Sequence, residues 1–159
     1  MRIERATIED AADILVLQRQ EYQSEATLYD DATIPPLTQT LDSFRAEFAD
    51  HIVLKVTSDG VLIGSVRALL LGDTGHIGRL VVRSEHQNQG IGTQLMQAIE
   101  QASSAATRFE LFTGHKSERN LALYRKLGYR EFKRERLHAT LTMVFLEKMA
   151  GSISRPNSR

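Results

Sequence analysis

The segment that most constrains the fold runs from Leu80 to Leu95, where an apolar strand leads into a polar loop and then into a helix. The loop ends in Gly90 and Gly92, and glycines allow a backbone to wrap closely around an anion. The helix that follows begins with unpaired N–H groups and a partial positive charge. This arrangement suits a diphosphate, and it equally suits a tight connection between strand and helix. Any fold for this chain must join a strand directly to a helix at this loop.

Two common nucleotide-binding motifs do not fit the same loop. The dinucleotide-binding fingerprint needs three glycines after a short connection, whereas only two glycines follow a long connection here. A P-loop needs Gly-Lys-Ser or Gly-Lys-Thr, and Gly92 is followed by Thr93 and Gln94. The loop therefore belongs to another class of anion-binding connection, if it binds an anion.

Hydrophobic periodicity and turn residues predict an α/β (α+β) chain with a mixed, mostly antiparallel sheet. A first helix is expected from a cap at Thr7 to about Tyr22, and an irregular stretch from Ala26 to the double proline at 35–36. Thr40 or Asp42 caps a second helix. Further helices are predicted at 93–103 and 118–127, and strands near Ile3 and at 52–57, 61–71, 76–82, 109–113, 129–137 and 141–147. This order predicts six to seven strands flanked by about four helices.

Length and composition narrow the class of protein. The 159 residues suit one domain over residues 1–150 with a flexible tail at 151–159. The absence of cysteine excludes disulfides and a cysteine nucleophile, and the five scattered histidines predict no metal site. Twenty basic and twenty acidic side chains cancel, which argues against nucleic acid as a partner. The absence of any apolar run near the ~20 residues of a membrane span favours a cytoplasmic location.

Two motifs together resemble a known family, the GNAT superfamily of acyl-CoA-dependent N-acetyltransferases. Gln87-x-x-Gly90-x-Gly92 is similar to the family's diphosphate-binding pattern, Gln/Arg-x-x-Gly-x-Gly/Ala after a Val-rich strand. Asn120, Tyr124 and Leu127-Gly128-Tyr129 resemble its Asn…Tyr…Leu-Gly-Phe/Tyr stretch at the expected separation. The resemblance implies a GNAT-like fold with acetyl-CoA as cosubstrate.

The resemblance also implies roles for individual positions. Backbone groups of Leu80, Val81 and Val82 would pair with the pantetheine amides, and the Val82 N–H would stabilise a tetrahedral oxyanion. Asn120 would hold the pantetheine arm, and Tyr124 would act as general acid toward the CoA thiolate. Backbone N–H groups of the loop would hold the diphosphate, at Gln87, Asn88, Gln89, Gly90, Ile91, Gly92 and Thr93.

The general base stays open at this stage. Many family members carry a Glu near the position of Arg79, and an arginine cannot accept a proton. The remaining candidates are Glu25, Glu110 and His115, and a chain of waters is an alternative to all three. Imidazole suits proton uptake near neutral pH, but a lone histidine in a loop, as His115 is, is more often a solvated residue.

The region that would contact the acceptor carries charges of both signs. Arg67 and Arg79 lie in apolar strands, where they either bind a substrate carboxylate or lie on a solvated face. Acidic residues of the first helix and the following stretch either attract a cationic amine or are simply solvated; these are Glu21, Glu25, Asp30 and Asp31.

These observations predict an N-acetyltransferase that moves an acetyl group from acetyl-CoA to a primary amine by direct attack, with a small molecule as acceptor. Two alternatives are a non-catalytic acyl-CoA sensor and a protein or peptide N-acetyltransferase. Exposed sheet edges near the C-terminus favour a homodimer. No metal, nucleic acid or membrane partner is expected.

Overall fold

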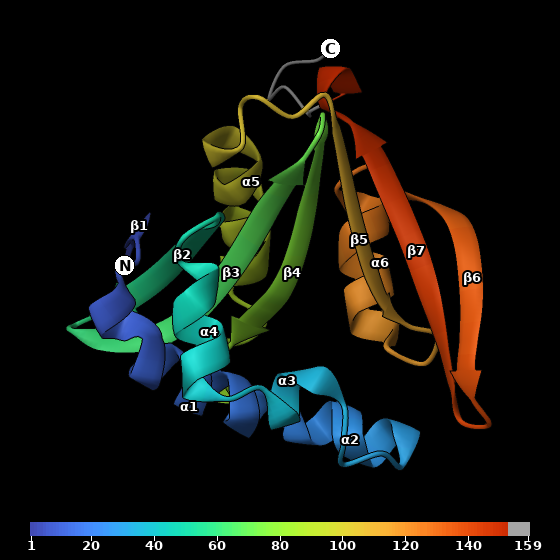
Figure 1. Cartoon of the computed structure of the whole chain (residues 1–159), viewed down its shortest axis with the longest axis horizontal. Helices are drawn as coiled ribbons and strands as arrows, with labels where there is room; N and C mark the ends of the chain where they lie inside the picture. The colour runs from blue at the N-terminus through green and yellow to red at the C-terminus, as the bar shows by residue number, and fades with distance from the viewer. Residues whose placement is uncertain (153–159) are drawn as a thin grey trace.

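A computed structural model describes residues 1–152 and contains one seven-stranded sheet in the order β1-β2-β3-β4-β5-β7-β6 (Figure 1). All neighbouring strands are antiparallel except β4 and β5, which are parallel. The expected mixed, mostly antiparallel sheet is confirmed. The strands are β1 (Arg2–Arg5), β2 (His51–Ser58), β3 (Val61–Leu71), β4 (Thr74–Val82), β5 (Arg108–Gly114), β6 (Arg130–His138) and β7 (Leu141–Met149).

Helices cover both faces of this sheet. In Figure 1, α5 and α6 lie behind the strands, and the four N-terminal helices lie in front and below. The helices are α1 (Ala11–Glu21), α2 (Gln23–Tyr29), α3 (Pro35–Thr38), α4 (Leu41–Glu47), α5 (Ile91–Ala102) and α6 (Glu118–Lys126). None of the helices among residues 1–152 is both long and apolar enough to cross a membrane.

Two apolar clusters hold the layers together. The larger cluster packs α5 and α6 against the sheet through Leu95, Ile99, Leu121 and residues of β3, β5 and β7. The smaller cluster packs α1 and α4 against the other face through Ile14, Phe44 and Val53. Residues 63–68 of β3 are buried without interruption because helices cover this strand on both faces.

Two regions differ from the sequence-based expectations. The stretch from Ala26 to Pro36 is not irregular throughout as expected, because α2 continues to Tyr29 and ends at Asp30 in a left-handed conformation (φ 50°). Pro35 and Pro36 begin α3 instead of breaking structure, because a proline in the first turn of a helix lacks only an N–H that would be unpaired. Of the expected tail at 151–159, residues 151 and 152 complete a 3-10 turn that begins at Ala150, and the rest lies outside the described residues.

The feature that positions the site is the separation of β4 from β5. These two strands pair only at their first residues, from Thr74 with Arg108 to His76 with Glu110, and then diverge. Figure 1 shows the two strands spreading apart like the arms of a V. A β-bulge in β4 accompanies this divergence, because Arg67 pairs with Gly78 but Ser65 pairs with Val81. The lower part of β4 therefore has a free edge toward β5.

Candidate active site

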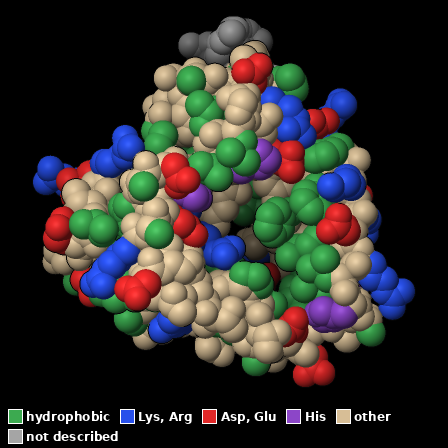
Figure 2. Space-filling view, viewed as in Figure 1, with side chains coloured by type: hydrophobic (Ala, Val, Ile, Leu, Met, Phe, Trp, Pro, Cys, Tyr) green, Lys and Arg blue, Asp and Glu red, His purple; other side chains and the backbone are tan. Residues whose placement is uncertain are grey.

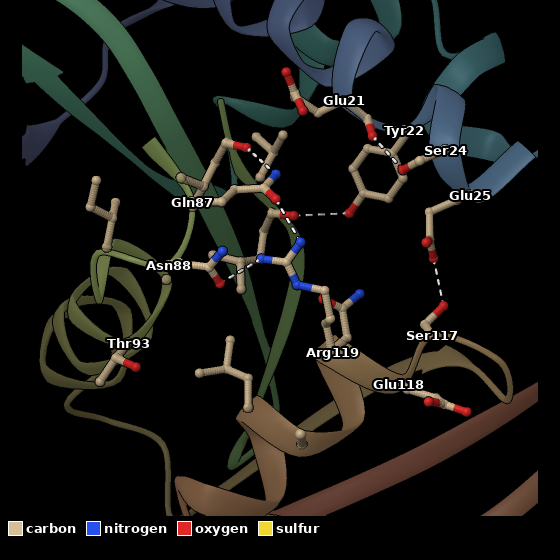
Figure 3. Close-up of a pocket in the computed structure, with 18 of the residues that line it drawn as sticks. Glu21, Tyr22, Ser24, Glu25, Gln87, Asn88, Thr93, Ser117, Glu118 and Arg119 are labelled. Atoms are coloured by element: carbon tan, nitrogen blue, oxygen red, sulfur yellow. Dashed lines mark hydrogen bonds between the residues drawn. The ribbon is translucent and has the colours of Figure 1, made fainter. Parts of the chain in front are cut away.

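A cavity of about 960 Å³ lies where β4 and β5 diverge. Its volume falls in the range of small-molecule and cofactor sites. The loop before α5, the first turns of α6 and the α1–α2 junction surround it (Figure 3). Among the predicted cofactor-binding residues, those that line it are Leu80, Val81, Val82, Gln87, Asn88, Gly90, Ile91, Gly92, Thr93 and Asn120; Gln89 and Tyr124 do not.

The N-terminus of α5 offers a set of unbonded amides to this cavity. Asn88 and Gly90 both adopt the left-handed conformation, with φ of 64° and 78°. The first helical hydrogen bond runs from the Gln94 N–H to the Gly90 carbonyl at 3.1 Å, so the N–H groups of residues 91–93 have no partner within the helix. Such a turn followed by a helix N-terminus is an anion-binding concavity. A Cβ placed on Gly90 would meet only open space, so crowding does not require glycine there. The positive φ is what favours glycine at this position.

The free edge of β4 presents the backbone of alternate residues. The Arg83 N–H donates to the Ile63 carbonyl at 2.7 Å, so Arg83 and Val81 direct their backbone groups toward β3. Leu80 and Val82 therefore direct theirs toward the cavity, whereas Val81, predicted to pair with the pantetheine arm, faces the wrong way for that role. Tyr22 donates to the Leu80 carbonyl at 3.2 Å.

Arg119 bridges the two sides of the cavity. From α6, its guanidinium donates to Gln87 Oε1 at 2.8 Å and to Asn88 Oδ1 at 3.1 Å, as Figure 3 shows. Arg119 forms no ion pair with an acidic residue among residues 1–152. Its charge therefore stays available to an anion next to the α5 amides, and Lys116 and Lys126 are two further cations that line the cavity.

Tyr124 lies just behind the cavity wall. Its ring is buried and packs edge-on against Tyr129, with ring centroids 6.1 Å apart. Burial raises the pKa of the Tyr124 hydroxyl well above its ordinary value, and the nearby Tyr22 and Glu25 raise it further. The hydroxyl therefore keeps its proton at neutral pH. One helical turn earlier, Asn120 donates to Thr113 Oγ1 at 3.3 Å.

Of the three candidate bases, the structure brings only Glu25 to the cavity. Its Oε1 accepts a hydrogen bond from Ser117 Oγ at 2.6 Å, visible in Figure 3. Tyr29 extends this chain, because its hydroxyl lies 2.7 Å from Ser117 Oγ and accepts from the Lys116 N–H at 2.9 Å. These hydrogen bonds hold the Glu25 carboxylate at the point where α2 approaches α6.

Glu110 and His115 lie elsewhere. Glu110 sits among the paired residues of β4 and β5 and forms an ion pair with Arg108 at 2.9 Å. His115 Nδ1 lies 3.0 Å from the Thr142 backbone nitrogen and 3.2 Å from the Thr142 carbonyl oxygen, so the backbone of β7 engages this ring nitrogen. Neither side chain lines the cavity.

Comparisons with known proteins assign the chain to a family. Residues 12–129 match the family described as the acetyltransferase (GNAT) family. The chain belongs to the GNAT family of acetyltransferases. A candidate acetyltransferase of Bacillus subtilis (strain 168) is 24% identical over 119 residues, which cover 74% of this chain and 79% of that protein.

Two solved structures share the fold. One is the PaiA N-acetyltransferase of Thermoplasma acidophilum in complex with coenzyme A, with a TM-score of 0.75 and 18% identity over 94% of this chain and 99% of the other. The second is YncA, a candidate acetyltransferase of Salmonella typhimurium, with acetyl-CoA. It has a TM-score of 0.75 and 16% identity over 100% of this chain and 99% of that one.

Several residues of the site in this GNAT protein escaped the sequence motifs. Tyr22, Tyr29, Ser117 and Arg119 act through contacts that join segments far apart in the chain. One signal was readable in principle: Gly114 interrupts the end of β5, and a Cβ there would collide with the Tyr29 hydroxyl. The partner that makes this glycine necessary lies 85 positions earlier and is visible only in the fold.

Proposed function

We propose that this acetyltransferase moves an acetyl group from acetyl-CoA to the primary amine of a small molecule, by direct attack. The observation that carries the proposal is the group of unbonded amides at residues 91–93, at the end of a β4 strand with a free edge. The amides suit a diphosphate, and the free edge suits an extended chain that carries its own amides. CoA contains both of these parts, because its diphosphate joins the amide-bearing pantetheine arm to an adenosine 3′-phosphate.

The proposed ligand geometry follows from the cavity. The diphosphate lies against the N-terminus of α5, within reach of Arg119. The pantetheine arm runs along β4 beside Leu80 and Val82. The thioester then lies near Tyr22 and Glu25, at the α1–α2 end of the cavity.

The chemical step needs three groups of this chain. The nitrogen of the neutral acceptor amine attacks the thioester carbonyl carbon to form the new C–N bond, and Glu25 accepts the proton that this nitrogen must then lose. The carbonyl oxygen takes up the displaced electron pair and is stabilised by the Val82 N–H. When the C–S bond breaks, sulfur leaves with that bond's electron pair and receives the Tyr124 proton. The products are an acetamide and CoA with a free thiol.

The test is a thiol-release assay with acetyl-CoA and a broad panel of amines, together with calorimetric titration of acetyl-CoA. The chain has no cysteine, so a thiol reagent detects only released CoA. We expect micromolar binding of acetyl-CoA and amine-dependent thiol release. Binding without release by any amine would favour the acyl-CoA sensor, and absence of binding at high micromolar acetyl-CoA would overturn the proposal.

A further inference from the structure

Arg79 is a half-buried cation for which the protein supplies no partner. Among residues 1–152 its side chain forms no hydrogen bond and no ion pair, and its Nε is completely buried without an acceptor. The two fully buried cations of the same range are paired: Arg67 contacts Glu47 at 2.8 Å, and Lys148 contacts Glu100 at 3.0 Å. A buried donor without an acceptor destabilises the folded state, so the unpaired Arg79 side chain needs an explanation.

The backbone at Arg79 is also unfavourable. Its φ of 55° lies in the left-handed region, which costs energy for a residue with a Cβ. Arg79 lies in the β-bulge, where two residues of β4 lie opposite one residue of β3. Strained residues persist where the surrounding fold enforces them, and they concentrate at functional sites.

The charges around Arg79 connect it with the proposed active site. Burial raises the pKa of Tyr22, the Arg79 cation opposes that effect, and the Glu25 carboxylate adds to it. Both charges are therefore close enough to act on the hydroxyl of Tyr22, which lines the cavity. Arg79 is not among the residues that line the cavity, but its charge acts on Tyr22, which is, and Glu25 lines the cavity near Tyr22 in the chain.

Open space lies next to Arg79. Gly78 is exposed, and no atom lies within 4 Å of a Cβ placed on it. Both residues follow the last pairing of β4 with β5, at the start of the gap between these strands. Figure 2 shows a hollow near the centre of the viewed face of the molecule, with a Lys or Arg side chain on one wall and hydrophobic side chains on the opposite wall.

We propose that the acceptor carries a carboxylate that binds the Arg79 guanidinium, so that the substrates are amino acids or small molecules that combine an amine with a carboxylate. This inference rests on the proposed acetyl transfer. The planar guanidinium matches a carboxylate with two parallel hydrogen bonds. The amine of the same molecule then faces Glu25. A phosphate dianion fits less well, because two carboxylates, Glu21 and Glu25, already line the cavity.

The experiment compares two acceptor pools in the thiol-release assay. One contains free L-amino acids with glycine, β-alanine and γ-aminobutyrate, and the other contains the corresponding amides. The amides have the less basic amines, so their intrinsic reactivity at neutral pH is the higher. We expect the free acids to react at least about tenfold faster in kcat/KM, as the loss of a charged hydrogen bond implies.

Variants assign this preference to Arg79. Arg79→Gln removes the preference mainly through a higher KM for the acids, and Arg79→Lys restores it in part. Arg79→Gln is expected to retain or raise thermal stability, because it removes an unpaired charge. Arg45→Gln, an exposed arginine on α4, serves as the charge-matched control and leaves kinetics unchanged.

The outcomes separate the two proposals. Amides that react as fast as acids, or an acid preference that survives in Arg79→Gln, overturn the carboxylate inference and leave acetyl transfer standing. Acetylation of peptide N-termini in place of free acids overturns it in the same way. If neither pool and no amine of the broad panel causes thiol release, the proposed acetyl transfer is overturned, and the carboxylate inference with it.

Discussion

Gln87 Nε2 donates a hydrogen bond to the Val82 carbonyl across 3.0 Å, and this bond occupies a backbone acceptor at the free edge of β4. Gln87 Oε1 in turn accepts from Arg119. The Gln87 side chain thus bonds a backbone acceptor that, in our account, the pantetheine arm bonds when CoA is present. In this account we expect CoA to replace these contacts on binding, which frees the Arg119 charge to face the phosphates.

The first prediction concerns Arg119. Arg119→Gln is expected to raise the Kd for CoA about tenfold and to weaken its dependence on salt, because one cation beside the diphosphate is lost. Calorimetry at two salt concentrations measures both effects. Arg125→Gln on the same helix is the matched control, since Arg125 is exposed and does not line the cavity. Equal losses in the two variants would contradict a local role.

Gly90 and Gly60 form a second matched pair. They have nearly the same φ, 78° and 77°, and open space surrounds a Cβ placed on either of them. Valine at either position therefore costs a similar amount, roughly 1–2 kcal/mol of stability. Only Gly90→Val is expected to weaken CoA binding, by tenfold or more, as measured by calorimetry. A comparable loss in Gly60→Val would mean that general destabilisation causes the effect.

Tyr124→Phe separates catalysis from binding. The Tyr124 hydroxyl forms no hydrogen bond with the described part of the chain, so its removal is expected to leave the fold and CoA affinity intact. The turnover number should fall by about 10²–10⁴-fold, the usual contribution of a general acid. Steady-state kinetics with a saturating acceptor measures this change. An unchanged turnover number removes Tyr124 from the mechanism.

The pH dependence of turnover follows from the raised pKa of Tyr124. A general acid is active while it is protonated, and its activity is lost as the pH rises through its pKa. Because this pKa lies above the ordinary value of 10, we expect no alkaline fall in kcat from tyrosine ionisation below pH 10. A fall near neutral pH that disappears in Tyr124→Phe would contradict the assignment.

Glu25→Gln tests the base. The substituted amide retains an oxygen for the Ser117 hydrogen bond but accepts no proton, so kcat is expected to fall by about 10²–10⁴-fold at pH 7. Glu21→Gln is the control, because Glu21 also lines the cavity but is engaged by Ser84 at 2.6 Å. If both variants turn over normally, a water chain carries the proton instead.

Much of the fold was accessible from the sequence, because local signals and the packing agree over most of the chain. Thr40 caps α4 by accepting from the Ser43 N–H at 3.1 Å, as its residue type predicts. The failure at residues 26–36 has a tertiary cause: Tyr29 is held by Ser117 and Lys116, and these contacts keep α2 helical.

The site was accessible only where it is built from consecutive residues. The loop from Gln87 to Thr93 is built from consecutive residues, and its two glycines indicate its conformation in the sequence itself. The proposed base could not be chosen from the sequence, since Glu25, Glu110 and His115 differ in the partners that the fold gives them, and not in their local sequence. The bulge at Arg79 also arises from the pairing of β4 with β3, which no local pattern encodes.

A crystal structure with CoA bound tests the central claim most directly. Our account predicts diphosphate oxygens within hydrogen-bonding distance of the N–H groups of residues 91–93, with the Gln87 side chain released from the Val82 carbonyl. A diphosphate bound elsewhere, with the Gln87 to Val82 hydrogen bond still in place, would contradict it.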